Sequence, residues 1–121
     1  MRFDGALFLA VLAVAGAAGA QTTESPEALQ AEAQAAFDRG DPRAALALAR
    51  RASAVRASPR LIRFMAVMQY ELGELPEAVD QADRCVLASQ ASEDPADRTD
   101  TLGVCQRMAA ELGAQVGRLD V

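Results

Sequence analysis

Small and apolar residues, chiefly alanine and leucine, gather in five runs along the chain, and a proline stands at the start of each run. None of these runs shows the strict alternation of apolar and polar residues that is typical of a β-strand. Alanine and leucine favour the helix instead. The pattern predicts helices over residues 26–38, 42–56, 59–72, 76–90 and 95–112.

The residues around the prolines and glycines set the ends of these helices. Four prolines follow a residue whose side-chain oxygen can cap a helix, namely Ser25, Asp41, Ser58 and Asp94. Proline is well suited to the next position, because its missing N–H costs nothing there. Pro76 follows Leu75 and lacks such a cap, although Glu74 is a partial substitute. Glycines are expected to end three of the helices, at Gly40, Gly73 and Gly113.

The final residues, 114–121 (AQVGRLDV), change to a strand-like character. We therefore expect a helical region over residues 21–113 and a separate C-terminal tail.

A pattern recurs within the helical region at an interval of 33 residues. Residues 39–52 (RGDPRAALALARRA) and 72–85 (LGELPEAVDQADRC) each carry glycine, an acidic residue, proline, and then a small and an aliphatic residue. Helices joined by turns of a few residues form antiparallel hairpins. Hairpins repeated at this interval are typical of a helical solenoid, in which each unit buries its apolar face against its neighbour.

On these residues the sequence resembles tetratricopeptide repeat proteins over residues 27–90. Small residues stand where helices of that family touch closely, here Ala33, Ala45, Ala52, Ala66, Ala78 and Cys85. Aliphatic and aromatic residues match other positions of the repeat, here Leu29, Phe37, Leu46, Ile62, Tyr70 and Val79. Pro42, Arg43 and Pro59 depart from the family pattern. The resemblance implies an all-α stack of antiparallel hairpins, about five helices in all, with the last helix as a cap.

Residues 1–20 read as a secretory signal peptide. Arg2 precedes an apolar run, and Ala18-Gly19-Ala20 supplies a small-residue cleavage site before Gln21. The run is shorter than the about 20 residues that a membrane span requires. We expect a periplasmic or secreted bacterial protein without a membrane span after cleavage; an uncleaved N-terminal anchor is the alternative.

The amino-acid composition limits which kinds of function the protein can have. The 121 residues contain no His and no Lys, and the net charge is −5. A general base of the imidazole type, a Schiff-base lysine and a His-containing zinc site are thereby excluded. The acidic balance argues against a nucleic-acid partner. An acidic stretch at residues 93–100 lacks the spaced oxygen ligands of a calcium loop. We therefore expect no enzyme activity, no cofactor and no metal.

Two cysteines, Cys85 and Cys105, fall on the predicted inward faces of the last two helices. In an exported protein, a disulfide between them is expected, and it would add about 3 kcal/mol of stability. Two buried, unpaired thiols are the alternative.

The resemblance also implies a binding groove lined by the first helix of each hairpin. The residues that it places there are Gln30, Gln34, Asp38, Arg60, Arg63, Phe64, Val67, Glu71 and Arg107. Arginine pairs well with carboxylates, so the ligand expected is a protein or peptide, and an acidic segment or the C-terminus of a polypeptide suits it. A solvated helix face is the plainer interpretation of each arginine.

At the level of the whole protein, the alternative to a groove-binding adaptor is a structural spacer or self-association module. On the residues Val-Gly-Arg-Leu of the tail, the sequence also resembles exported proteins in which helical repeats lead into a β-sandwich of the PEGA type.

Overall fold

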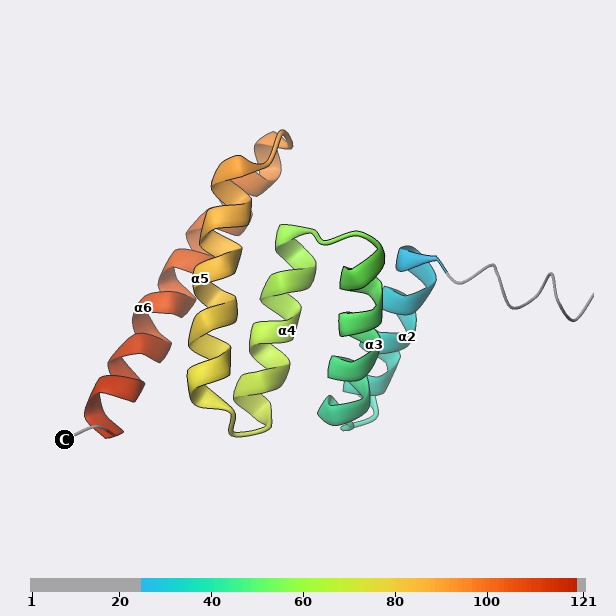
Figure 1. The fold of residues 1–121 in the computed structure, drawn as a ribbon, viewed down its shortest axis with the longest axis horizontal. Helices are drawn as coiled ribbons and strands as arrows, with labels where there is room; N and C mark the ends of the chain where they lie inside the picture. The colour runs from blue at the N-terminus through green and yellow to red at the C-terminus, as the bar shows by residue number, and fades with distance from the viewer. Residues whose placement is uncertain (1–24, 120–121) are drawn as a thin grey trace, which may run out of the picture.

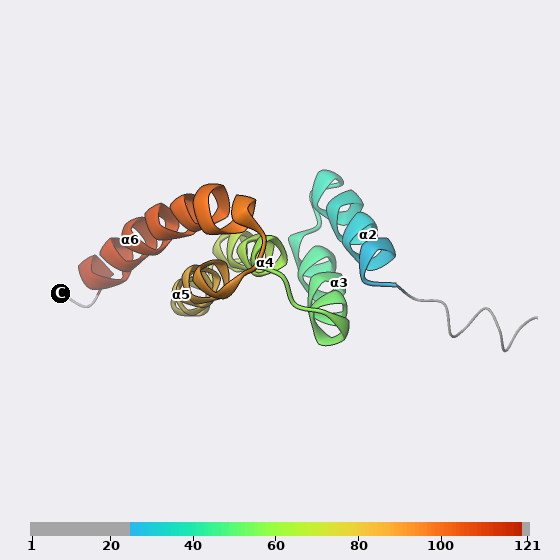
Figure 2. The ribbon, with the colours of Figure 1, turned by 90° about the horizontal axis from the view of Figure 1, so that it is seen from above.

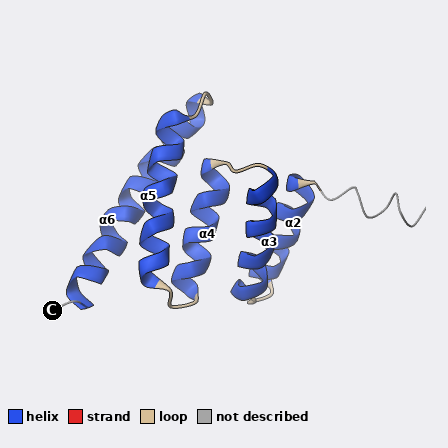
Figure 3. Ribbon diagram, viewed as in Figure 1, coloured by secondary structure: helices blue, strands red, loops and turns tan. Residues whose placement is uncertain are grey.

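The computed structural model describes residues 25–119, and within them it contains only helices and the loops that join them (Figure 3). The elements are α2 (Pro26–Asp38), α3 (Pro42–Val55), α4 (Pro59–Glu71), α5 (Leu75–Ala91), the π-helical turn η1 (Asp97–Thr101) and α6 (Leu102–Leu119). The all-α prediction is confirmed. The predicted signal peptide lies outside the described residues. None of the helices within residues 25–119 is long and apolar enough to cross a membrane.

The helices form a single row of antiparallel hairpins, in the order of the sequence (Figure 1). Each helix packs chiefly against its neighbours in sequence. An exposed ion pair between Glu27 and Arg56 joins the start of α2 to the end of α3, as antiparallel packing requires. Seen from above, α2, α4 and α6 lie toward one side of the row, and α3 and α5 lie toward the other (Figure 2). We call these sides the first-helix face and the second-helix face.

Three helices begin at the predicted caps. The side chains of Ser25, Asp41 and Ser58 accept hydrogen bonds from backbone N–H groups three residues ahead, at 3.1, 3.1 and 3.2 Å. The start of α5 differs from the expectation, because the side chain of Glu74 makes no capping bond. Its backbone N–H instead donates to the carbonyl oxygen of Gln69 at 2.8 Å, as part of the turn that ends α4.

Glycine ends α2 and α4 in the predicted way. Gly40 and Gly73 have φ angles of 83° and 77°, a left-handed conformation that side chains disfavour. In the first turn, the N–H of Asp41 donates to the carbonyl of Ala36 at 2.9 Å, which completes a Schellman motif. The reversals between hairpin helices therefore follow from local sequence.

Alanine dominates the core. All six small positions of the predicted repeat are buried, with exposed fractions of 1% or less. The larger core cluster joins α2, α3 and α4 through residues such as Leu29, Leu46, Leu61, Met65 and Met68. A much smaller cluster joins α5 to α6 through Ala78, Ala82 and Leu112. Because alanine side chains bury little area, the contact between α5 and α6 depends on additional links.

The predicted end of the last helix is wrong. Helix α6 passes through Gly113 and Gly117 and continues to Leu119, so residues 114–119 are helical and not strand-like. Leu112 is buried and Val116, one turn later, is half-buried, so the apolar face of the helix extends beyond the glycine. An internal glycine costs about 1 kcal/mol relative to alanine, and continued packing of this face offsets that cost.

The start of the last helix also differs from the prediction of one regular helix from residue 95. Asp94 caps the segment, since its Oδ1 atom accepts from the N–H of Ala96 at 2.9 Å. The next residues form the π-helical turn η1 before α6 begins at Leu102. Such turns are often found where a side chain is redirected, and here Asp97 is directed into the protein.

Candidate functional site

The first-helix face contains a groove of about 400 Å³ between α4 and α6. Helix α4 lines it with Ala66, Val67 and Tyr70, and α6 lines it with Val104, Arg107, Met108, Glu111, Leu112 and Gln115. The size lies within the range of ordinary ligand sites. We call it the α4/α6 groove.

The α4/α6 groove combines an apolar surface with a polar rim. Val67 and Met108 are half-buried, whereas Tyr70 is 46% exposed. The Nη1 atom of Arg107 lies over Gly103, where an added Cβ would stand 3.6 Å from it. That is an ordinary van der Waals distance, so the guanidinium lies along the helix beside Gly103. An exposed aromatic ring beside an arginine is the pattern found at protein-binding surfaces.

A second, smaller groove of about 170 Å³ lies between α2 and α4 on the same face. Its lining consists of Gln30, Ala33, Gln34, Arg60, Leu61, Arg63 and Phe64. Phe64 packs edge-to-face against Phe37 of α2, with ring centroids 6.2 Å apart. This contact joins the two hairpins and forms one wall of the groove. We call it the α2/α4 groove.

The structure distributes the nine predicted groove residues unevenly. Five of them line the α2/α4 groove, namely Gln30, Gln34, Arg60, Arg63 and Phe64. Val67 and Arg107 line the α4/α6 groove. Asp38 lines neither groove and instead accepts a hydrogen bond from Nε2 of Gln34 at 3.0 Å, which orients that amide. Glu71 is exposed at the end of α4 and lines neither groove.

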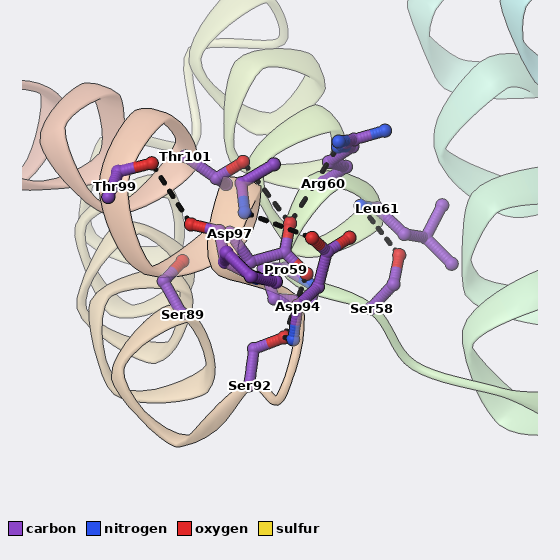
Figure 4. Close-up of polar contacts among 12 residues, drawn as sticks. Ser58, Pro59, Arg60, Leu61, Ser89, Ser92, Asp94, Asp97, Thr99 and Thr101 are labelled. Atoms are coloured by element: carbon purple, nitrogen blue, oxygen red, sulfur yellow. Dashed lines mark hydrogen bonds and ion pairs between the residues drawn. The ribbon is translucent and has the colours of Figure 1, made fainter.

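Arg60 is engaged within the protein. Its Nε atom lies 3.7 Å from Oδ1 of Asp97, whose side chain is only 11% exposed (Figure 4). Hydroxyl groups of Ser92 and Thr101 donate to the same carboxylate, at 2.9 and 3.3 Å. A buried carboxylate needs such donors. Arg60 is therefore partly neutralised, and it is a weaker candidate for a ligand than the sequence suggested.

Arg63 and Arg107 differ from Arg60 in this respect. Neither has an ion-pair partner among residues 25–119. One lies at the α2/α4 groove and the other at the α4/α6 groove. They are the two cations that these grooves present for an external carboxylate.

The predicted disulfide is present. Cys85 of α5 and Cys105 of α6 are bonded, with their Cα atoms 5.8 Å apart, and both residues are fully buried. The Sγ atom of Cys85 also lies 3.4 Å from the carbonyl oxygen of Pro59, at the start of α4. The bond thus holds α6, one wall of the α4/α6 groove, against the rest of the stack.

Sequence reasoning missed most of the wall that α6 contributes. Val104, Met108, Glu111 and Gln115 follow a spacing of three and four residues that places them on one helix face. Val104, Met108 and Glu111 lie within the helix predicted over residues 95–112, so its periodicity could have found them, and only Gln115 required extending the helix beyond residue 112. Tyr70 matches a position of the repeat pattern, and that match gives no sign that its ring is exposed as part of a surface.

Side chains suited to a metal ion do not gather in groups of three or more anywhere in the described part of the protein. Comparison with models of protein families found no match, and neither did comparison with curated proteins or with solved structures.

Proposed function

We propose that this protein is an exported adaptor that binds a segment of a protein partner on its first-helix face, in the manner of tetratricopeptide repeats. The α4/α6 groove carries the proposal, because it joins an exposed tyrosine and an unpaired arginine on one open surface. The adjoining α2/α4 groove extends this surface along the stack. Binding is proposed in place of catalysis because the sequence lacks His and Lys, and the buried carboxylate of Asp97 is held by Ser92 and Thr101 within the protein.

The charges on this face support an acidic ligand. Arg63 and Arg107 each have room for a carboxylate, and arginine binds carboxylates in a planar, two-pronged geometry. Glu111 lies beside Arg107 in the α4/α6 groove, so the positive charge is local. A short acidic segment with an apolar side chain suits this arrangement, with the side chain against Val67 and Met108.

An extracytoplasmic location accompanies the proposal. A buried disulfide persists in oxidising compartments and is rare in the cytosol. Together with the signal peptide predicted over residues 1–20, it supports a periplasmic or secreted protein.

The test is peptide binding with matched variants. Short acidic and neutral peptides selected from a random library are titrated into the disulfide-bonded protein, and affinity is followed by fluorescence anisotropy. Tyr70→Ala and Arg107→Glu should each weaken binding roughly tenfold, as expected for loss of a central contact. Leu87→Ala, at an exposed position on α5, is the control and should have no effect.

Two outcomes would contradict the proposal. The first is equal loss of affinity in the control variant. The second is the absence of any selected binder together with concentration-dependent self-association in sedimentation, which would favour a self-association module.

A further inference from the structure

The second-helix face contains a groove of its own, made of two adjoining hollows of about 270 and 340 Å³. The hollows share Ala57 and Ile62, so they form one continuous depression along α4, between α3 and α5. We call it the α3/α5 groove. It lies on the side of the stack opposite to the proposed adaptor surface (Figure 2).

The groove is mostly apolar at one end, where Pro59, Ala88 and Ala91 line it, and more polar at the other, where Ser53 and Gln81 stand beside the arginines. Ile62 and Met65 of α4 lie in its floor at one end, and Pro59 continues the floor at the other. Ala88 and Ala91 of α5 form a wall. Because the alanine side chains are short, they leave the hollow unfilled, and Ile62 remains half-buried.

Arginines occupy one end of the groove. Arg50 comes from α3 and Arg84 comes from α5, so they stand on opposite walls. Neither forms an ion pair within the described part of the protein. Neither hollow is lined by an acidic residue. The sequence between Asp41 and Glu71 contains six arginines and no acidic residue, although the protein as a whole is acidic.

The apolar hollows and the two arginines together indicate which kind of ligand the groove would bind. An aliphatic side chain fits the hollows over Ile62, and a carboxylate satisfies Arg50 and Arg84. A nucleic acid is disfavoured, because the protein carries a net charge of −5 and two arginines are too few to bind a long run of phosphates.

We propose that the α3/α5 groove is a second docking site, which binds a segment of another protein that combines aliphatic side chains with acidic ones. The site is independent of the adaptor surface on the first-helix face. It engages the segment through Ile62 and the flanking alanines for the aliphatic side chains, and through Arg50 and Arg84 for the carboxylates.

The experiment uses an acetylated and amidated peptide in which glutamates flank leucines, titrated into the disulfide-bonded protein labelled with ¹⁵N. Amide shifts are expected at Ala57, Ile62 and Ala88. The double variant Arg50→Glu and Arg84→Glu should weaken binding roughly tenfold, because two exposed charge pairs are lost. Replacing the glutamates of the peptide by lysines should abolish the shifts.

Two variants serve as controls for charge. Arg43→Glu lies on α3, does not line the groove and makes the same change of charge as Arg50→Glu alone, so it should leave the affinity unchanged where Arg50→Glu alone weakens it. Arg63→Glu changes a cation of the first-helix face, which is itself proposed to bind acidic segments, so its readout is restricted to the amides of Ala57, Ile62 and Ala88, and the affinity derived from their shifts should stay unchanged. Equal loss of affinity in either control would overturn the proposal, as would shifts that appear at Tyr70 and Met108 in place of the α3/α5 groove.

A steric variant tests the hollow without altering charge. Ala88→Leu should fill the second hollow and block the peptide, while circular dichroism confirms that the helices are intact. Undiminished binding to this folded variant would overturn the site, as would sedimentation that shows a second copy of the protein occupying the groove in preference to the peptide.

Discussion

Removing the disulfide should weaken the C-terminal part of the stack far more than the rest. Cys85 and Cys105 are 20 residues apart in sequence. In the chain-entropy account, closing a loop of this length stabilises the folded state by about 3 kcal/mol. Replacing both cysteines by alanine also removes two buried sulfur atoms, and each adds about 1 kcal/mol to the loss.

That loss is large relative to the stability of such a protein. About 95 ordered residues correspond to an unfolding free energy on the order of 5–10 kcal/mol, and an alanine core favours the lower values. The cluster that joins α5 to α6 contains only Ala78, Ala82 and Leu112 as buried apolar residues. The larger cluster lies in α2, α3 and α4 and does not include α6. Repeat stacks lose their units separately, so α6 should detach first.

Two assays separate the contributions. Urea unfolding followed by circular dichroism compares three species: the oxidised protein, the protein refolded under reducing conditions, and the variant Cys85→Ala with Cys105→Ala. We expect a loss of about 3 kcal/mol on reduction and about 4–5 kcal/mol in the variant. Hydrogen exchange should show α6 losing protection while α2 and α3 keep theirs.

Two results would contradict the expected effect of the disulfide. A difference below about 1 kcal/mol between the oxidised and reduced proteins would refute the entropic argument. A uniform loss of protection, with α2 as exposed as α6, would refute the claim that the disulfide acts locally.

Three further predictions concern the helix ends and the buried acid, and urea unfolding measures each of them. Gly113→Ala should raise stability by about 1 kcal/mol, because the position lies inside α6 with open space around it. Gly73→Ala should instead lower stability by about 1 kcal/mol, because the φ angle of Gly73 is positive. Ser58→Ala should cost about 1 kcal/mol through its lost cap, and Glu74→Ala should leave stability unchanged. Asp97→Ala should cost about 1–3 kcal/mol, because it leaves the buried hydroxyl of Thr101 and the half-buried hydroxyl of Ser92 without their acceptor.

The positions of the first four helices follow closely from local sequence signals. Ser25 and Ser58 begin helices because their hydroxyl groups accept from the backbone, and Gly40 and Gly73 end helices because they adopt a left-handed conformation. These effects depend on a few neighbouring residues. The small positions of the repeat were predictable for a related reason, because close contact between helices excludes larger side chains.

The sequence-based predictions were wrong where contacts between residues far apart in the sequence determine the structure. Gly113 reads as a helix end from its neighbours alone, but the half-buried Val116 shows that packing continues past it. Arg60 reads as a free groove cation, but its partner Asp97 lies 37 positions further along the sequence and reaches it only through the π-helical turn. The spacing of Leu112 and Val116 gives a sign of the first, whereas the pairing of Arg60 with Asp97 depends on how the last hairpin sits on the stack.

The α3/α5 groove could not be predicted from the sequence for a different reason. Ala57 and Ala88 are the same residue type as the buried core alanines, and sequence does not distinguish an alanine that fills a contact from one that leaves a hollow. The row of hairpins is one unit thick, so α4 is reached from both sides: Tyr70 lines one groove and Ile62 lines another. Met65 and Met68 between them are buried and belong to the larger cluster. A packed helix of this kind holds the two grooves in a fixed relation, which is what the two proposed docking sites would require in order to bring two partners together.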